Sequence, residues 1–316
     1  MTLNILILAA GLGTRMKSEK SKVMHEILGR PMLEYIFDSS EVLSPSRIIL
    51  LLSPNQKDIF NRYKNRNLFF ATQERPLGTG DAVKSALQEL EESADLMVLA
   101  GDVPLITVKT LQKMYESHLK EMNSITFLTM NLDNPKGYGR VYMQRKKIRA
   151  IIEEKDASDK IKKINEVNSG IYTFSYDFLT KNINGLRNEN AQKEYYITDL
   201  VKIAYDKNEK TQAIMIDDAN EVSGINDRQQ LGDIEQIMLK RKLETLMKNG
   251  VTIRNPQTVY IDDSVKVFPD TEIKSNVVLK GNTIIENKCT IGEFSFIKNG
   301  LVKSGSEIKP HTIIDE

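Results

Sequence analysis

The 316-residue chain has one cysteine, no tryptophan and only three histidines. A single thiol, Cys289, excludes an intrachain disulfide and any multi-cysteine zinc or iron–sulfur site. The histidines stand too far apart in sequence for a helical metal motif. An excess of charge is also lacking, because 44 Lys and Arg face 43 Asp and Glu. Such a chain has no global field to attract nucleic acid or an anionic bilayer, so neither is an expected partner.

Long hydrophobic runs are missing too. No stretch of about 18 apolar residues occurs, so no segment is expected to span a membrane. The first ten residues are apolar enough to resemble a signal peptide, but they lack the Lys or Arg that precedes the apolar stretch of such a peptide. A glycine-rich turn also follows them directly. We therefore predict a buried first strand and a cytoplasmic protein.

Short apolar runs alternate with longer amphipathic stretches up to about residue 225, which is typical of an α/β fold. The predicted elements are strands at 5–8, 48–52, 68–71, 96–100, 125–130 and 168–174, and helices at 31–43 and 80–90. The first four strands are continuously apolar, so we expect them in the centre of a sheet covered on both faces. Ligands of such a sheet bind at the carboxyl ends of its strands.

The periodicity changes after residue 226. Residues 227–249 predict one amphipathic helix, with Asp227 and Gln230 as a capping pair and Gly250 as its stop. Beyond it, aliphatic residues recur every six positions, each preceded two positions earlier by a small or β-branched residue. The aliphatic set is Ile261, Val267, Ile273, Leu279, Ile285, Ile291 and Ile297, and after one shortened step Val302, Ile308 and Ile314 resume the period.

A six-residue period predicts a β-helix, in which stacked coils bury a continuous core. About nine repeats give roughly three coils, and Cys289 fills a small-residue position of that core. The predicted parts of the chain are therefore a first domain at 1–226, a connector at 227–250 and a β-helix at 251–316.

Polar motifs follow three of the predicted strands. The first is Leu8-Ala9-Ala10-Gly11-Leu12-Gly13-Thr14-Arg15-Met16. Its glycines let backbone N–H groups approach phosphate oxygens. It lacks the third glycine of a dinucleotide fingerprint and the Gly-Lys-Ser/Thr of a Walker loop. Basic residues from Arg15 to Arg30 outnumber acidic ones, which fits either a phosphate-binding loop or a tight turn with a solvated basic face.

The second and third motifs supply an amide and a carboxylate. Gln73 precedes Leu-Gly-Thr-Gly-Asp-Ala at 77–82, and a Gln amide can read both a donor and an acceptor on a nucleobase. Asp102 ends a predicted buried strand, where a lone carboxylate suits Mg²⁺ bound together with substrate phosphates. Taken singly, each motif is also compatible with an ordinary turn.

In this order the motifs resemble those of the sugar-1-phosphate nucleotidyltransferases. Later segments complete the pattern: Gly137-Tyr138-Gly139-Arg140, Glu153-Glu154-Lys155-Asp156, Asn168-Ser169-Gly170-Ile171, Glu194-Tyr195-Tyr196-Ile197-Thr198-Asp199 and Gly224-Ile225-Asn226. The chain is similar above all to the uridyltransferase half of the bacterial bifunctional enzymes that acetylate glucosamine-1-phosphate and then make UDP-N-acetylglucosamine. The resemblance implies a Rossmann-like nucleotide-diphospho-sugar transferase domain, a short left-handed β-helix of hexapeptide repeats and a homotrimer.

The resemblance also assigns site residues by position. The uracil nucleotide would be held by the Leu8, Ala9, Ala10 and Gly11 backbone and the Gln73 amide, with Gly13, Gly78, Thr79 and Gly101 in the same substrate site. Arg15 would bind the departing pyrophosphate and Lys22 the α-phosphate. Mg²⁺ would be ligated by Asp102 and Asn226. N-acetylglucosamine would be bound by Gly139, Glu153, Asn168 and Thr198.

The implied reaction is direct transfer of UMP from UTP to N-acetylglucosamine-1-phosphate, which gives UDP-N-acetylglucosamine and pyrophosphate for cell-envelope precursor synthesis. Alternatives are a pyrophosphorylase for another sugar-1-phosphate or for dTTP, and a non-catalytic regulatory relative that would be expected to lose Arg15, Lys22 or Asp102. Two departures bear on base and sugar preference: Asp81 stands where the bifunctional enzymes commonly have His, and Ala100 where many have an aromatic residue or Leu. The short β-helix predicts that acetyltransferase activity is absent.

Overall fold

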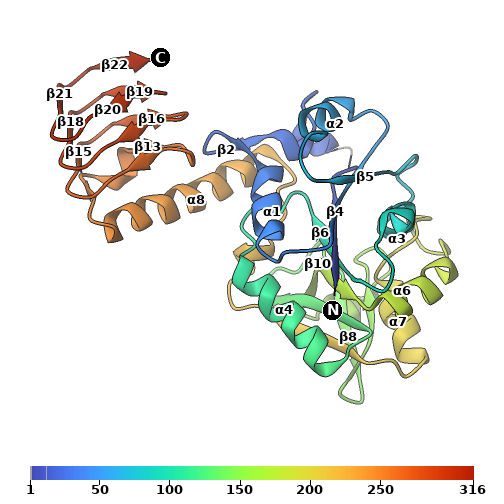
Figure 1. Ribbon diagram of the computed structural model, residues 1–316. Helices are drawn as coiled ribbons and strands as arrows, with labels where there is room; N and C mark the ends of the chain where they lie inside the picture. The colour runs from blue at the N-terminus through green and yellow to red at the C-terminus, as the bar shows by residue number, and fades with distance from the viewer. Residues whose placement is uncertain (1, 12) are drawn as a thin grey trace. The chain divides into compact units, whose positions relative to one another are not determined.

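The computed structural model describes residues 2–11 and 13–316 and divides the chain into two compact units. The first unit runs to Met24 and resumes over Met32–Gly224, and the second combines His25–Pro31 with Ile225–Glu316 (Figure 1). Each unit has its own architecture, so each is described separately.

The first unit is built on a mixed sheet with the strand order β11-β7-β10-β6-β1-β4-β5. The strands are β1 (Leu3–Leu8), β4 (Arg47–Leu52), β5 (Phe69–Thr72), β6 (Asp95–Ala100), β7 (Ile125–Asn131), β10 (Glu166–Phe174) and β11 (Thr211–Met215). β1 pairs in parallel with β4 and β6, whereas β10 is antiparallel to β6 and β7. The sheet predicted from the apolar runs is therefore confirmed.

One expected position in the sheet is wrong. The run at 68–71 was expected in the centre, but β5 is the last strand of the order and Phe69 is exposed. Arg47 lies over the Phe69 ring at 4.6 Å from its centroid. The long alkyl stem and the guanidinium of an arginine shield such an edge residue from water, and this allows an apolar run at an edge.

Seven α-helices of the described chain belong to this unit: α1 (Met32–Glu41), α2 (Lys57–Tyr63), α3 (Thr79–Ser85), α4 (Val108–Glu121), α5 (Asp159–Lys162), α6 (Tyr176–Asn182) and α7 (Asp199–Asp206). The helix predicted at 31–43 matches α1. The helix predicted at 80–90 ends earlier, because the chain tightens into a 3₁₀ turn at Leu87–Glu89. Two further strands, β8 (Arg140–Gln144) and β9 (Lys147–Ile152), form a hairpin attached to β10.

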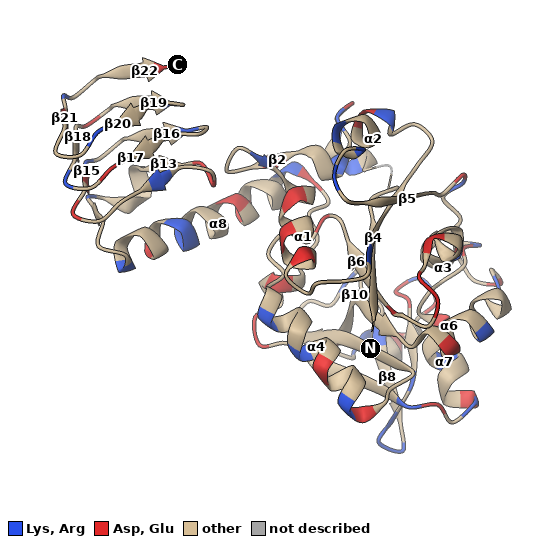
Figure 2. Cartoon of the chain, viewed as in Figure 1, with Lys and Arg blue, Asp and Glu red and all other residues tan. Residues whose placement is uncertain are grey.

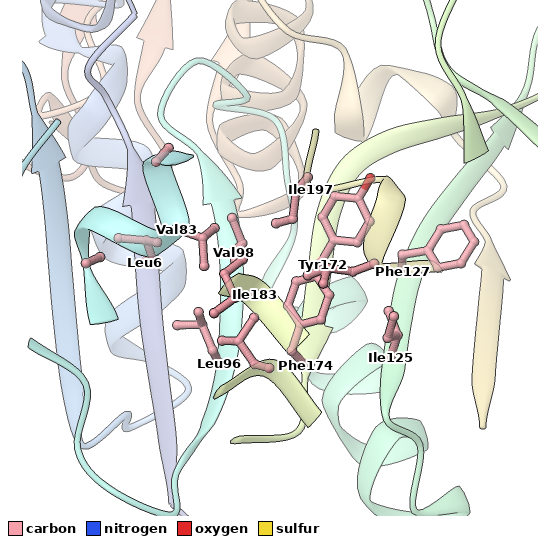
Figure 3. Packing of buried hydrophobic residues seen from close by; sticks show 14 of the residues in the cluster. Leu6, Val83, Leu96, Val98, Ile125, Phe127, Tyr172, Phe174, Ile183 and Ile197 are labelled. Carbon is pink, nitrogen blue, oxygen red and sulfur yellow. The ribbon is translucent and has the colours of Figure 1, made fainter. Parts of the chain in front are cut away.

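The core of this unit lies on both faces of the sheet. Figure 3 shows one side, where Leu6, Val98 and Phe174 pack with Val83 and Ile183. Residues of the opposite parity, such as Ile5 and Ile7, are also fully buried. Burial on both faces explains why β1, β4 and β6 are continuously apolar rather than alternating.

The second unit joins a hairpin, a long helix and a β-helix. The hairpin is β2 (Glu26–Ile27) with β3 (Arg30–Pro31), and the helix is α8 (Arg228–Lys248), which carries both basic and acidic residues (Figure 2). Asp227 accepts the Gln230 backbone N–H at 2.9 Å, as the predicted cap requires. The hairpin was not foreseen from the sequence. It is fixed by the Leu28 N–H donating to Glu235 and by an Arg30–Asp263 ion pair of 2.6 Å.

The β-helix has three parallel sheets. Its strands are β12 (Thr252–Ile253), β13 (Tyr260–Ile261), β14 (Lys266–Val267), β15 (Glu272–Ile273), β16 (Val278–Lys280), β17 (Ile284–Ile285), β18 (Thr290–Ile291), β19 (Phe296–Lys298), β20 (Leu301–Val302), β21 (Glu307–Ile308) and β22 (Ile313–Asp315). Ile261, Ile285 and Ile297 are fully buried, and Cys289 is 1% exposed. The period of six and the core role of Cys289 are thus confirmed. No helix in the described ranges is long and apolar enough to cross a membrane.

Candidate functional site

Most residues predicted to bind the nucleotide line one pocket of about 330 Å³ in the first unit. The pocket lies where β1, β4, β5 and β6 end, at the carboxyl edge of the sheet. The predicted site residues that line this pocket are Leu8, Ala9, Ala10, Gly11, Lys22, Gln73, Gly78, Thr79 and Asp102. Side chains that are up to 94 residues apart in the chain, Leu8 and Asp102, thus share one wall.

The glycine loop is held by backbone bonds on both sides. The Ala9 N–H donates to the Leu51 carbonyl at 3.0 Å, and the Gly101 N–H donates to the Leu8 carbonyl at 2.9 Å. Gly13 has φ 59°, and a Cβ there would lie 2.7 Å from the Lys22 Cβ. Glycine at this position therefore allows both the left-handed backbone and the close approach of Lys22. Leu12, inside the predicted motif, lies outside the described residues.

A basic and an acidic side chain meet at the floor of this pocket. Lys22 forms an ion pair with Asp102, and both side chains are largely buried, at 14% and 19% exposure. The Gly224 backbone also lies beside Asp102, since a Cβ there would be 3.5 Å from its Oδ2. Asp102 helps to raise the pKa of Tyr138, although burial is the larger cause. The lysine predicted to bind the α-phosphate and the aspartate predicted to bind the metal are therefore in direct contact.

One buried amide that the sequence did not single out connects the two loops of the site. Gln56 is 8% exposed, and its Nε2 donates to the Ala9 carbonyl at 2.8 Å and to the Ser21 hydroxyl at 2.9 Å. Its Oε1 accepts the Ser53 N–H at 2.8 Å. Gln56 thus ties the glycine loop to the segment that carries Lys22, through contacts that no local pattern reveals.

The residues predicted to bind the sugar form a second cluster. Thr198 Oγ1 donates to Glu153 at 3.0 Å, and the Asn168 N–H donates to the Gly139 carbonyl at 2.9 Å. A Cβ on Gly139 would lie 3.4 Å from the Glu153 carboxylate. A bulge in β10 follows Asn168, and such bulges turn side chains out of the regular ladder. All four residues are therefore within one small region.

The acid in this cluster has a perturbed pKa. Burial raises the pKa of Glu153, and the nearby Asp156, Asp199 and Glu194 raise it further, while the bond from Thr198 lowers it. Glu153 also lies on the wall of a larger cavity of about 860 Å³ beside β9 and α7. That cavity holds none of the predicted phosphate-binding residues on its described wall, whereas the smaller pocket holds most of the residues predicted to bind the nucleotide.

The segment 194–198 connects the nucleotide pocket and the sugar cluster. Glu194 lines the nucleotide pocket. The Gly80 N–H donates to the Tyr195 carbonyl at 2.7 Å, and Thr79 Oγ1 accepts the Ile197 N–H at 3.1 Å. Thr198 then reaches Glu153. The short segment therefore holds the two sets of residues side by side.

Two predicted residues stand apart from these sets. Arg15 is exposed on a 3₁₀ turn (Thr14–Met16) and is not part of the described pocket wall. Asn226 belongs to the second unit, where its backbone N–H donates to Gln230 Oε1 at 2.7 Å and leads into α8. The roles of Arg15 and Asn226, like those of the other site residues, stay predictions.

Comparison with known proteins gives a consistent result. Residues 4–250 match the family described as nucleotidyl transferase. The chain is 42% identical to the bifunctional protein GlmU of Fervidobacterium nodosum, over 97% of this chain and 66% of that protein. It is 39% identical to bifunctional protein GlmU of Clostridioides difficile, over 100% of this chain and 69% of the relative. It is 41% identical to the bifunctional protein GlmU of Thermosipho africanus, over 88% of this chain and 60% of that protein.

The chain spans about two thirds of the length of these curated relatives. The predicted absence of acetyltransferase activity therefore stays a prediction. The match from residue 4 to 250 includes every site residue named above, and the family predicted from the motifs is confirmed. The chain belongs to the nucleotidyl transferase family and is a nucleotidyltransferase of the sugar-1-phosphate type.

Proposed function

We propose that the chain transfers UMP from UTP to N-acetylglucosamine-1-phosphate and releases pyrophosphate, with Mg²⁺ as cofactor, in the synthesis of cell-envelope precursors. The observation that carries this proposal is the single pocket in which Lys22 and Asp102 meet the glycine loop and Gln73. The uridyl and N-acetylglucosamine preference is taken from the resemblance of the ordered motifs to the uridyltransferase half of the bifunctional enzymes, and the relatives named bifunctional protein GlmU agree with that resemblance.

The donor set around Asp102 fits a magnesium ion that is completed by substrate. No group of three or more His, Cys, Asp or Glu side chains able to hold a metal occurs in the described ranges. Mg²⁺ is commonly bound by one or two carboxylates together with phosphate oxygens, and it needs no closed protein cage. Asp102 would be that carboxylate, and the role of Asn226 stays a prediction from the resemblance. When bound, the ion would neutralise phosphate charge.

The chemistry that this chain supplies is positioning and charge neutralisation. Both substrates are anions, and the attacking phosphate oxygen of the sugar-1-phosphate must approach the α-phosphorus of UTP in line. Lys22 would hold an oxygen of the α-phosphate, because it lines the pocket beside Asp102. Arg15 and the glycine-loop N–H groups would hold the leaving pyrophosphate.

Acceptor binding is proposed for the cluster around Glu153. A sugar hydroxyl donates well to an ionised carboxylate, while the Asn168 amide and the Gly139 backbone can recognise further polar groups. Because the pKa of Glu153 is raised, the ionised form gains population as the pH rises through that value. Acceptor affinity should therefore improve as the pH rises through the raised pKa of Glu153.

A homotrimer assembled through the β-helix is proposed from the resemblance and from one surface feature. Val278, Phe296 and Ile313 are register neighbours on the outside of one sheet, and Ile284 and Leu301 are neighbours on another. Ile313 is 77% exposed and Leu301 55%. Apolar ladders of this kind favour association between copies. Sedimentation of the wild-type chain and of Phe296→Glu tests this, with a trimer expected only for the wild type.

A substrate panel separates the proposed activity from its alternatives. Pyrophosphate release is measured with UTP, dTTP, CTP, ATP and GTP against several sugar-1-phosphates. The highest kcat/KM is expected for UTP with N-acetylglucosamine-1-phosphate. A preference for dTTP or another sugar would select the related pyrophosphorylase. A regulatory relative is disfavoured because Arg15, Lys22 and Asp102 are all present, and it would release no pyrophosphate with any pair.

A further inference from the structure

The amide that faces the nucleotide pocket is held in one orientation by two acceptors. Gln73 follows β5, is 7% exposed and lines the pocket. Its Nε2 donates to the Asp81 carboxylate at 2.9 Å and to the Gly78 carbonyl at 3.1 Å. Neither partner has a hydrogen to offer, so this end of the amide must be the NH₂ group. The assignment of nitrogen and oxygen therefore follows from the chemistry of the partners.

The two acceptors are themselves fixed. Gly78 has φ 110°, and a Cβ there would lie 2.5 Å from the Tyr195 carbonyl, so the loop is tightly packed. The Gly78 carbonyl accepts the Ala82 N–H at 3.1 Å. Asp81 lies in the first turn of α3, where its carbonyl accepts the Ser85 hydroxyl at 2.9 Å. The Gln73 nitrogen is thus held toward α3 by groups with little freedom to move.

The oxygen of the same amide is left for a ligand. In the described part of the chain, no other side chain or backbone group bonds to Gln73 Oε1. The site therefore presents a hydrogen-bond acceptor where the amide meets the pocket. An acceptor requires a donor on the ligand, and in a uracil nucleotide the base has one N–H group, at N3. Cytosine has a bare acceptor nitrogen at that position.

We propose that Asp81 is a positioning residue for base selection: its carboxylate holds the Gln73 amide with the oxygen toward N3 of the base, so that the site accepts uracil and rejects cytosine. This inference rests on the proposed function, because it requires a pyrimidine nucleotide against Gln73. Asp81 makes no direct contact with the base in this scheme. It acts by preventing the amide from turning its NH₂ group to the ligand.

The test is the ratio of kcat/KM for UTP to that for CTP, measured by pyrophosphate release and checked by nucleotide binding titrations. Asp81→Ala is expected to lower this ratio about tenfold, the value of one ordinary hydrogen bond. The change should arise in KM for UTP, with kcat little altered. Lys84→Ala is the matched control, because Lys84 is exposed on the same helix, and it should leave the ratio unchanged.

A charge-swapped pair separates positioning from simple damage. Gln73→Glu alone should raise KM for UTP more than tenfold, since the new carboxylate would face Asp81 and the Gly78 carbonyl. Adding Asp81→Asn should restore KM to within about threefold, because the new amide at position 81 can donate to the carboxylate at position 73. The second carboxylate oxygen would again accept from N3–H.

The outcomes are distinct. An unchanged UTP to CTP ratio in Asp81→Ala, or a double variant no better than Gln73→Glu, would overturn this inference while the proposed function stands. A wild-type chain that binds no uracil nucleotide would overturn the proposed function and this inference together.

Discussion

The two units of this molecule differ in how regularly their buried residues are arranged. In the β-helix, Ile285, Ile291 and Ile297 fill equivalent positions, and each coil pairs in register with the next. In the nucleotidyltransferase unit, the buried polar residues Gln56 and Gln73 follow the ends of β4 and β5. Uniform apolar burial stabilises a scaffold, whereas buried polar groups hold a particular geometry. The proposed chemistry of this chain lies in the less regular unit.

The largest effect on activity is expected from removal of the Asp102 carboxylate in the nucleotidyltransferase unit. Asp102→Ala is expected to lower turnover by about 10²- to 10³-fold, because it removes the proposed metal ligand and the partner of Lys22. The melting temperature should change little. Asp133→Ala, at an exposed loop position, is the matched control for pyrophosphate release. Near-normal turnover of Asp102→Ala in Mg²⁺ would contradict the metal assignment.

The scaffold side of the comparison predicts a large effect on stability. Ile291→Ala should destabilise the second unit by about 3 kcal/mol, because Ile291 is 0% exposed and its removal leaves a cavity. Thr290→Ala, the outward-facing neighbour, should cost far less. Denaturant unfolding followed by circular dichroism measures both. Equal effects of the two variants would show that the inward column does not carry the stability of the β-helix.

Acid should weaken the nucleotidyltransferase unit through a buried histidine. His118 is 2% exposed beside Thr126, and burial lowers its pKa to about 4. The folded state keeps the ring neutral, while the unfolded chain binds a proton near pH 6.5. The contribution of His118 to the free energy of unfolding is therefore fully present above about pH 6.5. It falls as the pH is lowered to about 4, by roughly 3 kcal/mol at most.

The difference in the free energy of unfolding between pH 7 and pH 4.5, measured by denaturant unfolding, checks this expectation. His118→Gln should remove most of the pH dependence. His311, which is exposed in the β-helix and stacks on Phe294, gives the comparison within the same chain, and His311→Gln should leave the dependence intact. If the free energy of unfolding of His118→Gln depends on pH as strongly as that of the wild type, His118 is not the cause of the acid sensitivity.

The smallest of these effects concerns Gln56. Gln56→Ala removes the two hydrogen bonds that join the glycine loop to the Lys22 segment and a third, local bond with the Ser53 N–H. We expect kcat to fall about tenfold, with a smaller change in KM, because positioning of the α-phosphate is lost while most contacts to UTP persist. Steady-state kinetics normalised to the concentration of folded protein, measured by circular dichroism, distinguish this from a general loss of folded protein. A rise in KM alone would assign Gln56 to nucleotide binding and not to positioning.

Prediction from the sequence succeeded where the structure is local. Each hexapeptide places its own aliphatic residue inward, so the β-helix core and the role of Cys289 could be predicted from spacing alone. The strands β1, β4 and β6 were recognised for a similar reason, because burial on both faces gives continuous apolar runs. The edge position of β5 could not be predicted, since it depends on which strands pair.

The site required information from distant segments. The ordered motifs identified Lys22, Gln73 and Asp102, but only the fold shows that Lys22 contacts Asp102 and that Gln73 is fixed by Asp81. Gln56 had no sequence signal, because its partners lie 47 and 35 positions away. The hairpin of β2 and β3 was missed for the same reason, since its contacts with α8 and the β-helix join segments more than 200 residues apart.

The central claim is that this chain performs uridylyl transfer at the Lys22–Asp102 pocket. The most direct test is the initial rate of pyrophosphate release by the purified wild-type chain and by Lys22→Ala, with UTP and N-acetylglucosamine-1-phosphate. Release should require both substrates and added Mg²⁺, should yield one UDP-sugar per pyrophosphate, and should fall by at least a hundredfold in Lys22→Ala. Wild-type release that is absent under these conditions, or equal rates for the two proteins, would contradict it.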